Sequence, residues 1–188
     1  MLIGPPAVGK MTVGQALEER LGYKLFHNHT TIEMVAPYFS YGSEAGRHLV
    51  KQLREAFLEA FAEDTGTGYI FTYVWAFGVS GEREYIEGLA TKFSSKGHPV
   101  YLVELEATFD ERLRRNRTEN RLTHKPTKRD VAWSDDHLRD MDANHRLNSL
   151  PGEMAYDTYL RIDNTHRSAA EVAAQICDHF GLKPPDGA

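Results

Sequence analysis

The stretch Gly4-Pro5-Pro6-Ala7-Val8-Gly9-Lys10-Met11-Thr12 lies directly before residues 13–21, which the sequence predicts to be helical. Glycines flank its central part, and glycine adopts backbone angles that other side chains forbid. Such a loop can turn its N–H groups inward around a phosphate, at the positive end of the following helix. Lys10 adds a mobile charge that can reach the outer phosphates of a triphosphate. The stretch therefore predicts a phosphate-binding loop.

The residue after the lysine distinguishes this loop from the strict pattern. That pattern has Ser or Thr directly after Lys, whereas this chain has Met11 there and Thr12 one residue later. The alternative is a Gly- and Pro-rich turn that binds no ligand, but the helix that follows favours phosphate binding. Thr12 also supplies the one loop hydroxyl that could contact a metal ion. We expect the phosphates of ATP to be bound by Gly4, Ala7, Val8, Gly9, Lys10, Met11 and Thr12.

The composition indicates a single well-buried domain. The chain has 188 residues, of which 41% are apolar, and this length is short for two domains. The net charge of −5 argues against a general nucleic-acid or anionic-membrane surface, so neither partner is expected. No apolar run approaches the roughly 20 residues of a membrane helix, and no signal peptide is visible. The single cysteine, Cys177, excludes an internal disulfide, fits a reducing cytoplasm and is expected in the core.

Predicted strands and helices alternate along the chain, which implies a parallel sheet with helices on both faces. Residues 1–3 make a very short first strand, so either the start has been trimmed or the middle strand is stubby. We expect one domain over residues 1–188, a three-layer α/β/α fold with a five-stranded parallel sheet, and a frayed tail at 183–188. The further strands are expected at 23–26, 69–77, 98–105 and 156–162, and the further helices at 30–35, 43–63, 82–95, 109–118, 134–148 and 168–180, with an exposed polar loop at 120–130.

The Lys-x-Thr loop, the five-strand alternation and the arginine-rich helix that leads into a polar loop resemble the nucleoside-monophosphate-kinase-like group of P-loop proteins. This group includes adenylate kinases, shikimate and gluconate kinases and the small antibiotic phosphotransferases. The resemblance covers most of the chain as architecture, but only the phosphate loop and the arginine segment as motif. It implies a P-loop NTPase fold with a small lid, ATP and Mg²⁺ as cofactors, and transfer of a phosphoryl group to a small acceptor molecule.

The arginine segment spans residues 111–121 and carries five arginines. One interpretation is a solvated helix face paired with neighbouring acids. The other places guanidinium groups near a phosphoryl group, whose charge spreads over its oxygens during transfer. In the resembled kinases such arginines come from this helix and from the lid, which would span residues 118–131 here. The resemblance implies catalytic roles for Lys10, Arg112, Arg115 and Arg117, and lid contacts to the phosphates from Arg121, Lys125 and Arg129, joined by His124 and Lys128.

The polar triplet His27-Asn28-His29 follows the second strand. In open parallel sheets, ligands bind at the carboxyl ends of the strands. A hydroxyl acceptor would suit these side chains, and either histidine could act as a base near neutral pH. The alternatives are histidines satisfied by the backbone, or a metal pair that lacks a third ligand. The expected acceptor contacts are His27, Asn28, His29, Arg47, Arg54, Tyr73 and Trp75, although aromatic residues on a buried strand are often core.

The third predicted strand lacks an acid. P-loop enzymes usually end this strand with an Asp that holds the magnesium shell or acts as a base, and Thr72 or Tyr73 stands there instead. With Met11 after the lysine, two metal-holding groups are missing. Magnesium would therefore be bound by the triphosphate, with water as most of its other ligands. The sequence favours an ATP-dependent kinase that acts on a hydroxyl of a small acceptor. The alternatives are a nucleoside or nucleotide kinase, or a non-catalytic ATP-binding regulatory module.

Overall fold

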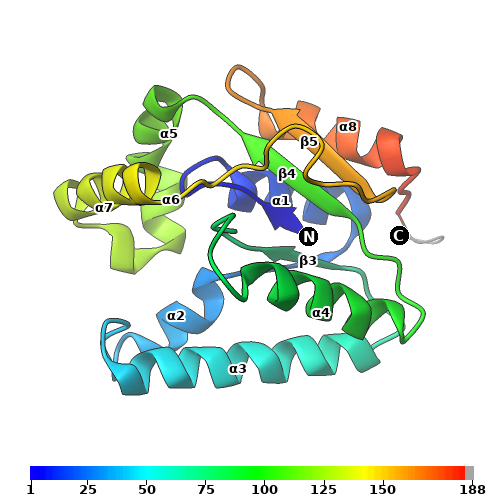
Figure 1. Cartoon of the computed structure of the whole chain (residues 1–188), viewed down its shortest axis with the longest axis horizontal. Coiled ribbons are helices and arrows are strands. Elements are labelled where there is room, and N and C mark those ends of the chain that lie inside the picture. The colour runs from blue at the N-terminus through cyan, green and yellow to red at the C-terminus, as the bar shows by residue number, and fades with distance from the viewer. Residues whose placement is uncertain (185–188) are drawn as a thin grey trace.

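A computed structural model describes residues 1–184, so the end of the expected tail lies outside the described residues. Its centre is a five-stranded, all-parallel sheet in the order β2-β3-β1-β4-β5 (Figure 1). The predicted α/β class with a five-stranded parallel sheet is therefore confirmed. The strands are β1 (Leu2–Ile3), β2 (Lys24–His27), β3 (Tyr69–Thr72), β4 (Leu102–Glu106) and β5 (Tyr159–Asp163).

Helices cover both faces of the sheet (Figure 1). On one face α1 (Lys10–Leu21) packs beside α8 (Ala169–Phe180), and apolar side chains of both helices join those of β1, β4 and β5 in one buried cluster that includes Cys177. On the other face lie α3 (Glu44–Glu63) and α4 (Glu82–Ser94), whose Leu58 and Leu89 pack against aromatic residues of β2 and β3. No helix within residues 1–184 has the length and apolar character needed to cross a bilayer.

The central strand β1 is the shortest element of the sheet. Leu2 pairs with Thr72 of β3 on one side and with Val103 of β4 on the other. Both of its residues are almost wholly buried, because neighbouring strands and helices surround them on every side. The strand delivers the chain directly into the loop that begins at Gly4.

The third strand is shorter than predicted. The apolar run over residues 69–77 predicts one buried strand, but β3 ends at Thr72. Its neighbour β1 ends at Ile3, so beyond the single bond from the Tyr73 N–H to the Leu2 carbonyl the run has no strand to pair with. Residues 73–77 instead continue as extended chain into the core, where Trp75 stacks on Phe77 with ring centroids 4.5 Å apart.

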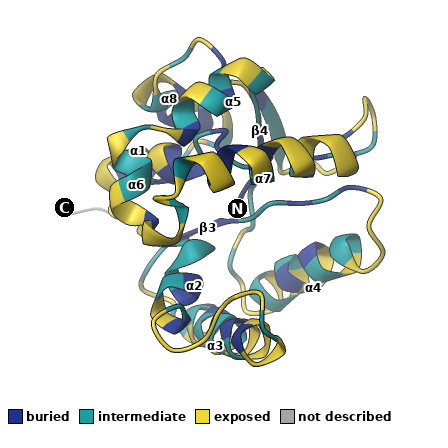
Figure 2. Cartoon of the chain, turned by 90° about the vertical axis from the view of Figure 1, so that its left-hand side faces the viewer, coloured by how far each residue is buried: buried dark blue, intermediate teal, exposed yellow. Residues whose placement is uncertain are grey.

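The region after β4, which includes residues 118–131 where the lid is expected, folds into helices. It contains α5 (Phe109–Asn116), α6 (Glu119–His124), the 3-10 helix η1 (Pro126–Lys128) and α7 (Val131–Asn144). The expectation of an exposed loop over residues 120–130 is wrong, because short helices form there. Asp130 caps α7 by accepting a hydrogen bond from the Trp133 N–H, so α7 begins three residues earlier than predicted. In Figure 2 α7 is mostly exposed, apart from Ser134, Asp135 and Leu138.

The turn from β1 into the loop requires glycine. Gly4 has φ +133°, and a Cβ atom at this position would lie 2.3 Å from the Leu105 carbonyl oxygen of β4. We expect Gly4→Ala to lower the free energy of unfolding by about 3 kcal/mol, from backbone strain and the clash together. Urea denaturation measures the change.

Gly88→Ala is the matched control. Gly88 is exposed in α4, and a Cβ atom there would meet no other atom within 4 Å. This substitution should stabilise the protein by roughly 0.5–1 kcal/mol, because Ala favours a helix interior. Similar effects of the two substitutions would contradict a special conformational requirement at Gly4.

Candidate functional site

The loop over residues 4–12 lies at the carboxyl edge of the sheet. Gly4, Ala7 and Gly9 all have positive φ, at 133°, 60° and 105°, and α1 begins at the next residue, Lys10. The Lys10 ammonium donates to the carbonyl oxygens of Gly4 (2.5 Å) and Pro5 (2.8 Å), so the lysine folds back across its own loop. Burial, followed by repulsion from Lys125, holds the pKa of Lys10 well below its usual range. An anion that reached the loop would relieve both penalties.

Arg115 and Asn164 form a clamp that holds the loop at the Val8 carbonyl. The Arg115 guanidinium donates to the Val8 carbonyl (2.8 Å), and the Asn164 side-chain amide donates to the same oxygen (2.9 Å). Arg115 also donates to the Asn164 carbonyl (2.7 Å) and to Glu111 (2.7 Å). The guanidinium is therefore occupied by protein acceptors. The sequence predicts a catalytic role for Arg115, whereas the structure places it as a positioning residue that holds the loop against the turn after β5.

The other two arginines that were expected to be catalytic tie α5 to α7. Arg112 is buried, forms an ion pair with Asp142 and lies over the Phe109 ring. Arg117 donates to Asp135 from both Nε (3.0 Å) and Nη2 (2.6 Å). Neither side chain lines the cavity described below. Both arginines instead anchor the base of the lid, and the structure does not bring them to the loop.

The segment over residues 118–131, the expected lid, contacts the helices on either side of the loop. Near its start, the Asn120 amide donates to the Gln15 side chain of α1 (3.1 Å). Near its end, the Thr127 hydroxyl donates to Glu33 of α2 (His29–Val35) at 2.6 Å. Since α1 and α2 flank the carboxyl edge of the sheet, the lid bridges the two sides of the site.

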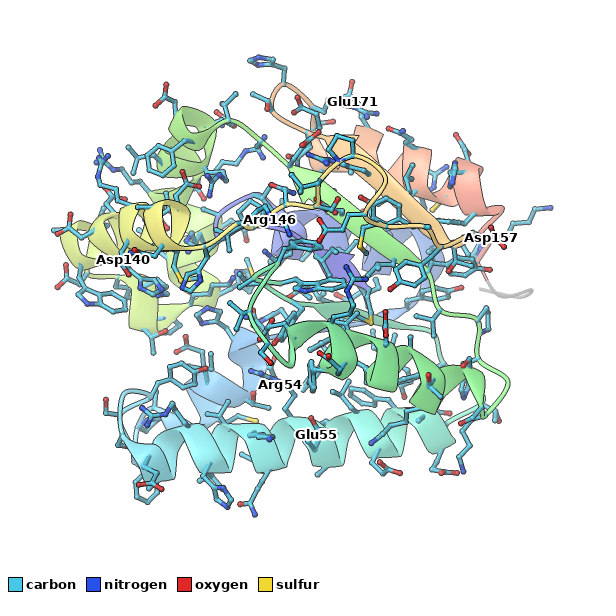
Figure 3. The ribbon with its side chains drawn as sticks, viewed as in Figure 1. Arg54, Glu55, Asp140, Arg146, Asp157 and Glu171 are labelled. Atoms are coloured by element: carbon cyan, nitrogen blue, oxygen red, sulfur yellow. The ribbon has the colours of Figure 1, made fainter. Side chains whose placement is uncertain are left out.

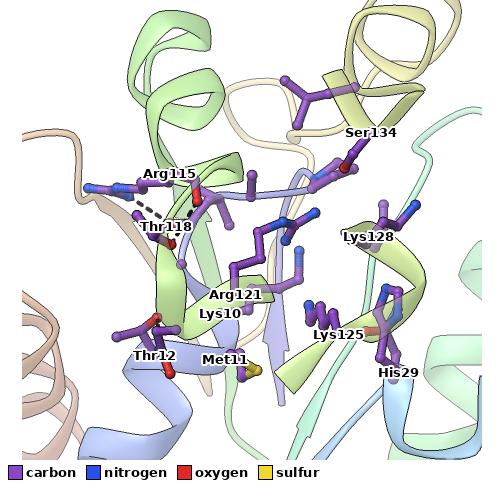
Figure 4. A pocket seen from close by; sticks show the side chains of 18 of the residues that line it. Lys10, Met11, Thr12, His29, Arg115, Thr118, Arg121, Lys125, Lys128 and Ser134 are labelled. Atoms are coloured by element: carbon purple, nitrogen blue, oxygen red, sulfur yellow. Dashed lines mark hydrogen bonds between the residues drawn. The ribbon is translucent and has the colours of Figure 1, made fainter. Parts of the chain in front are cut away.

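A cavity of about 1120 Å³ lies between the loop and the lid. Among the cationic side chains that line it, four lie together: Lys10 from the loop and Arg121, Lys125 and Lys128 from the expected lid (Figure 4). Burial, reinforced by repulsion from Arg121, lowers the pKa of Lys125 to about 7 and the pKa of Lys128 to about 8. Burial alone lowers the pKa of Arg121 to about 10. This crowding of cations gives the cavity a strong preference for a multiply charged anion.

Negative charge is scarce around the cavity. Among the described residues that line it, the one carboxylate is Glu111, whose pKa falls to about 2 because Arg114 and then Arg115 donate to it. Arg129, which was expected to face the phosphates, donates to the Leu122 carbonyl within the lid and does not line the cavity. Of the five lid residues predicted to face the phosphates, Arg121, Lys125 and Lys128 line the cavity, whereas His124 and Arg129 do not.

The predicted acceptor residues divide among three places. Asn28 and His29 line the main cavity, whereas Arg47, Arg54 and Tyr73 line a second cavity of about 310 Å³ beside α3 and α4. Arg54, labelled in Figure 3, reaches from α3 toward the end of β2 and donates to the Asn28 carbonyl (2.9 Å).

His27 and Trp75 line neither cavity. His27 ends β2, where burial, followed by repulsion from Lys125, lowers its pKa to about 4. Trp75 is only 1% exposed and is a core residue, so the expectation that it contacts an acceptor is corrected.

The residues around the loop do not form a protein-held magnesium site. Met11 is buried where a hydroxyl is usual, and the exposed Thr12 hydroxyl lies 3.4 Å from the Asn120 amide. Thr72, at the end of β3, accepts a hydrogen bond from the Asn28 N–H (3.1 Å). A search of residues 1–184 finds no group of three His, Cys, Asp or Glu side chains that could hold a metal ion. The donor set fits a polyphosphate.

The turn after β5, which the resemblance implies would pass beside the adenine, also holds the loop, and the sequence does not indicate this contact. Asn164 is buried, with its side chain on the Val8 carbonyl, and Thr165 accepts from Arg115 and donates to Asp163. A polar Asp-Asn-Thr triplet directly after the last strand was the available signal. Its partners lie on the loop and on α5, more than forty positions away in the chain, so the pattern alone could not reveal the clamp.

Comparisons with known proteins bear on the fold. No family model matches the chain, and no curated protein matches it. Solved structures do match it over nearly the whole length. An inferred kinase from Chloroflexus aurantiacus superposes with a TM-score of 0.64 at 17% identity, covering 95% of each chain.

Two further matches are an APS kinase and a tunicamycin resistance protein. The APS kinase of Mycobacterium tuberculosis, in complex with AMPPNP and APS, has a TM-score of 0.60 at 14% identity and covers 96% of this chain and 95% of its own. The tunicamycin resistance protein of Deinococcus radiodurans has a TM-score of 0.53 at 21% identity and covers 98% and 96%. The chain therefore has the fold of the P-loop small-molecule kinases.

The clamp predicts unequal effects for two adjacent arginines. Arg115→Ala should lower the free energy of unfolding by about 3 kcal/mol, because the Val8, Asn164 and Thr165 carbonyls each lose a charged donor. Arg114→Ala should change it by no more than about 0.5 kcal/mol, since Arg114 is 68% exposed and pairs only with Glu111. Chemical denaturation of both variants measures the difference. Equal losses would show that Arg115 contributes only its surface ion pair.

The crowded lysines predict a pH dependence of anion binding. Between pH 6.5 and 9, Lys125 and Lys128 lose their protons through pKa values of about 7 and 8, so positive charge leaves the cavity. We expect the affinity for AMPPNP, measured by calorimetry, to fall at least about tenfold over this range.

A double variant, Lys125→Arg with Lys128→Arg, controls for the titration of the ligand itself. Arginine stays protonated throughout this range, so the variant should show only the slope that the ligand contributes. The same slope in both proteins would mean that the two lysines do not carry the pH dependence.

Proposed function

We propose that this protein is an ATP-dependent phosphotransferase that moves the γ-phosphoryl group of ATP to a hydroxyl of a small acceptor. The observation that carries the proposal is the convergence of Lys10, Arg121, Lys125 and Lys128 on one cavity above the phosphate loop. Phosphoryl transfer asks a protein mainly for positioning and for stabilisation of the charge on the transferred group. The loop supplies the first and the four cations supply the second. The kinase fold of the matching structures supports the same reaction class.

The nucleotide would lie along the cavity from the turn after β5 to the lid. Asn164, Thr165 and Arg167 line one end, beside the loop, where a nucleoside can pack. The phosphates would occupy the loop and the cation cluster in the middle. Lys10 would exchange its bonds to the Gly4 and Pro5 carbonyls for bonds to phosphate oxygens, a change of partners that needs only rotation about its side-chain bonds.

The acceptor would enter from the other end, near α2. His29 and Asn28 line this end of the main cavity. Tyr41 lines both cavities, so the smaller one, with Arg54 and Tyr73, adjoins the place where an acceptor hydroxyl would meet the phosphoryl group. Among the matching structures, the shikimate kinase of Acinetobacter baumannii is in complex with shikimate, and the APS kinase holds APS, so small acceptors are bound on this fold.

A second candidate function is a nucleotide-binding module without turnover. Two observations favour it: Met11 replaces the usual metal-binding hydroxyl, and Thr72 ends β3 where an acid is usual. Such a module would bind ATP through the same loop and would not consume it with any acceptor. The two candidates therefore differ in turnover and agree in binding.

An acceptor screen decides between the two candidates. The full chain is incubated with ATP and Mg²⁺ and with panels of sugars, nucleosides, hydroxy acids and hydroxyl-bearing antibiotics, and ADP release is measured. We expect acceptor-dependent ADP release for one panel, and Lys10→Ala should lower kcat/KM about 10²–10³-fold, because a charge that stabilises the transition state is lost.

Lys24→Ala is the control. Lys24 is exposed at the start of β2 and lies outside the cavity lining, so its removal should leave turnover unchanged. ADP release that no acceptor stimulates and that Lys10→Ala does not alter would contradict the phosphotransferase.

A further inference from the structure

We infer that Glu33 and Thr127 position His29 as the base that receives the proton of the acceptor hydroxyl. Closure of the lid completes this arrangement, because it brings Thr127 to Glu33. The inference rests on the proposed phosphotransferase function and assigns a residue to its proton transfer. It links three elements: α2 carries His29 and Glu33, the lid carries Thr127, and the cavity lies between them.

The geometry is a short chain of hydrogen bonds. His29 is the first residue of α2, and its Nδ1 lies 3.4 Å from Oε1 of Glu33, one helical turn later. The same carboxylate oxygen accepts the Thr127 hydroxyl at 2.6 Å. Within residues 1–184, no protein group bonds to Nε2 of His29, and the ring lines the cavity beside Lys125 and Lys128 (Figure 4). One nitrogen of the ring is therefore held and the other is left for a substrate.

The protonation state follows from the groups that face the ring. Burial is the main cause that lowers the pKa of His29, to about 3; the bond to Glu33 opposes it, and Lys125, Lys128 and Arg121 act with the burial. The imidazole is therefore neutral at pH 7. Burial raises the pKa of Glu33, but hydrogen bonds from His29 and Thr127 outweigh this and hold it below its usual value. An ionised Glu33 accepts only, so Nδ1 of His29 carries the hydrogen and Nε2 carries the free lone pair.

The proton step balances with this arrangement. As the acceptor oxygen bonds to the γ-phosphorus and the bond to the leaving ADP oxygen breaks, the hydroxyl proton moves to Nε2. The imidazolium that forms is stabilised by the Glu33 carboxylate on its other side. It later returns the proton to water. Bound triphosphate offsets the charges of Lys125, Lys128 and Arg121, so the pKa of His29 rises from its depressed value when the substrate is present.

The contact from Thr127 to Glu33 requires a closed lid, so the positioning of His29 depends on closure. Thr127 lies in η1, and in an open lid its hydroxyl cannot reach Glu33, which would then lose one of its two side-chain partners. The other lid contact, from Asn120 to Gln15, lies on α1 and does not involve α2. Closure without Thr127 would therefore still cover the loop but would hold Glu33 less firmly.

One test is independent of catalysis. Nitrogen-15 NMR of the histidine side chains in the full chain, with His29→Gln to assign the signal, reports the tautomer. We expect His29 to be neutral at pH 7 with the hydrogen on Nδ1, and Thr127→Val to shift its signals more than Thr123→Val does. Thr123 is an exposed lid residue of the same type and has no contact with Glu33, so it is the matched control. A hydrogen on Nε2, or equal shifts from the two threonine variants, would overturn the inference.

A second test uses turnover with an acceptor from the screen. His29→Gln should lower kcat about 10²–10³-fold with little change in the KM for ATP. Glu33→Gln should lower kcat about tenfold and move the acidic limb of the kcat profile to lower pH, because the carboxylate raises the pKa of His29. Thr127→Val should lower kcat by about threefold to tenfold, with Thr123→Val unchanged.

The two tests separate the inference from the proposed function. Turnover with an unshifted acidic limb in Glu33→Gln would refute the positioned base and leave the phosphotransferase standing. The expected NMR tautomer without acceptor-dependent turnover would instead refute the phosphotransferase, and with it the catalytic use of His29.

Discussion

The Val8 carbonyl oxygen accepts hydrogen bonds from both Arg115 and Asn164, and the geometry of the site depends on this shared contact. A loop with three positive φ angles has little reason to keep one conformation by itself. The clamp ties it to α5 through Arg115 and to the end of β5 through Asn164. This end of the cavity is thereby formed by three segments that are distant in the chain but are held to one oxygen atom. Arg112 and Arg117 tie the same helix α5 to α7, so the clamp also connects α7 to the loop.

Electrostatic crowding is the second constraint, and it opposes stability. Lys10, Lys125 and Lys128 are held together in a buried space with pKa values below their usual range, so the folded state binds these protons less tightly than the unfolded chain does. Between pH 7 and 10 the unfolded chain holds more protons on these groups, and their contribution to stability therefore rises with pH. A polyanion removes the repulsion instead. The site is thus arranged so that the ligand supplies the charge balance that the protein leaves open.

The sequence predicted what is local and missed what depends on distant partners. Glycine at positions 4 and 9, the lysine that follows and the alternation of strands and helices are local signals, and they were enough for the loop, the sheet and the short β1. The sequence does not show which of Arg112, Arg115 and Arg117 bind other parts of the protein and which face a phosphate. Their partners in the structure are Asp142, the Val8 carbonyl and Asp135 respectively, so all three bind the protein itself. The helices α6 and η1 were missed because they are short and polar, without an apolar period. The apolar run through Trp75 looked like strand because the sequence does not show that β1 ends at Ile3.

The two sides of the carboxyl edge of the sheet differ in the groups that line them. This difference explains why the sequence indicates a phosphate donor more clearly than a phosphoryl acceptor. On the side of β1, β4 and β5, backbone carbonyls, Arg115 and Asn164 form one rigid frame around the loop, and the same frame fits any polyphosphate. On the side of β2 and β3, the surfaces are side chains: the neutral ring of His29, the tyrosines around the smaller cavity, and Arg54 bonded to a carbonyl. Specificity for an acceptor arises from such side chains, since each substitution changes the shape and charge of the pocket without disturbing the frame. The fold thus holds the loop side of the edge in one geometry and leaves the other side to side chains that can change.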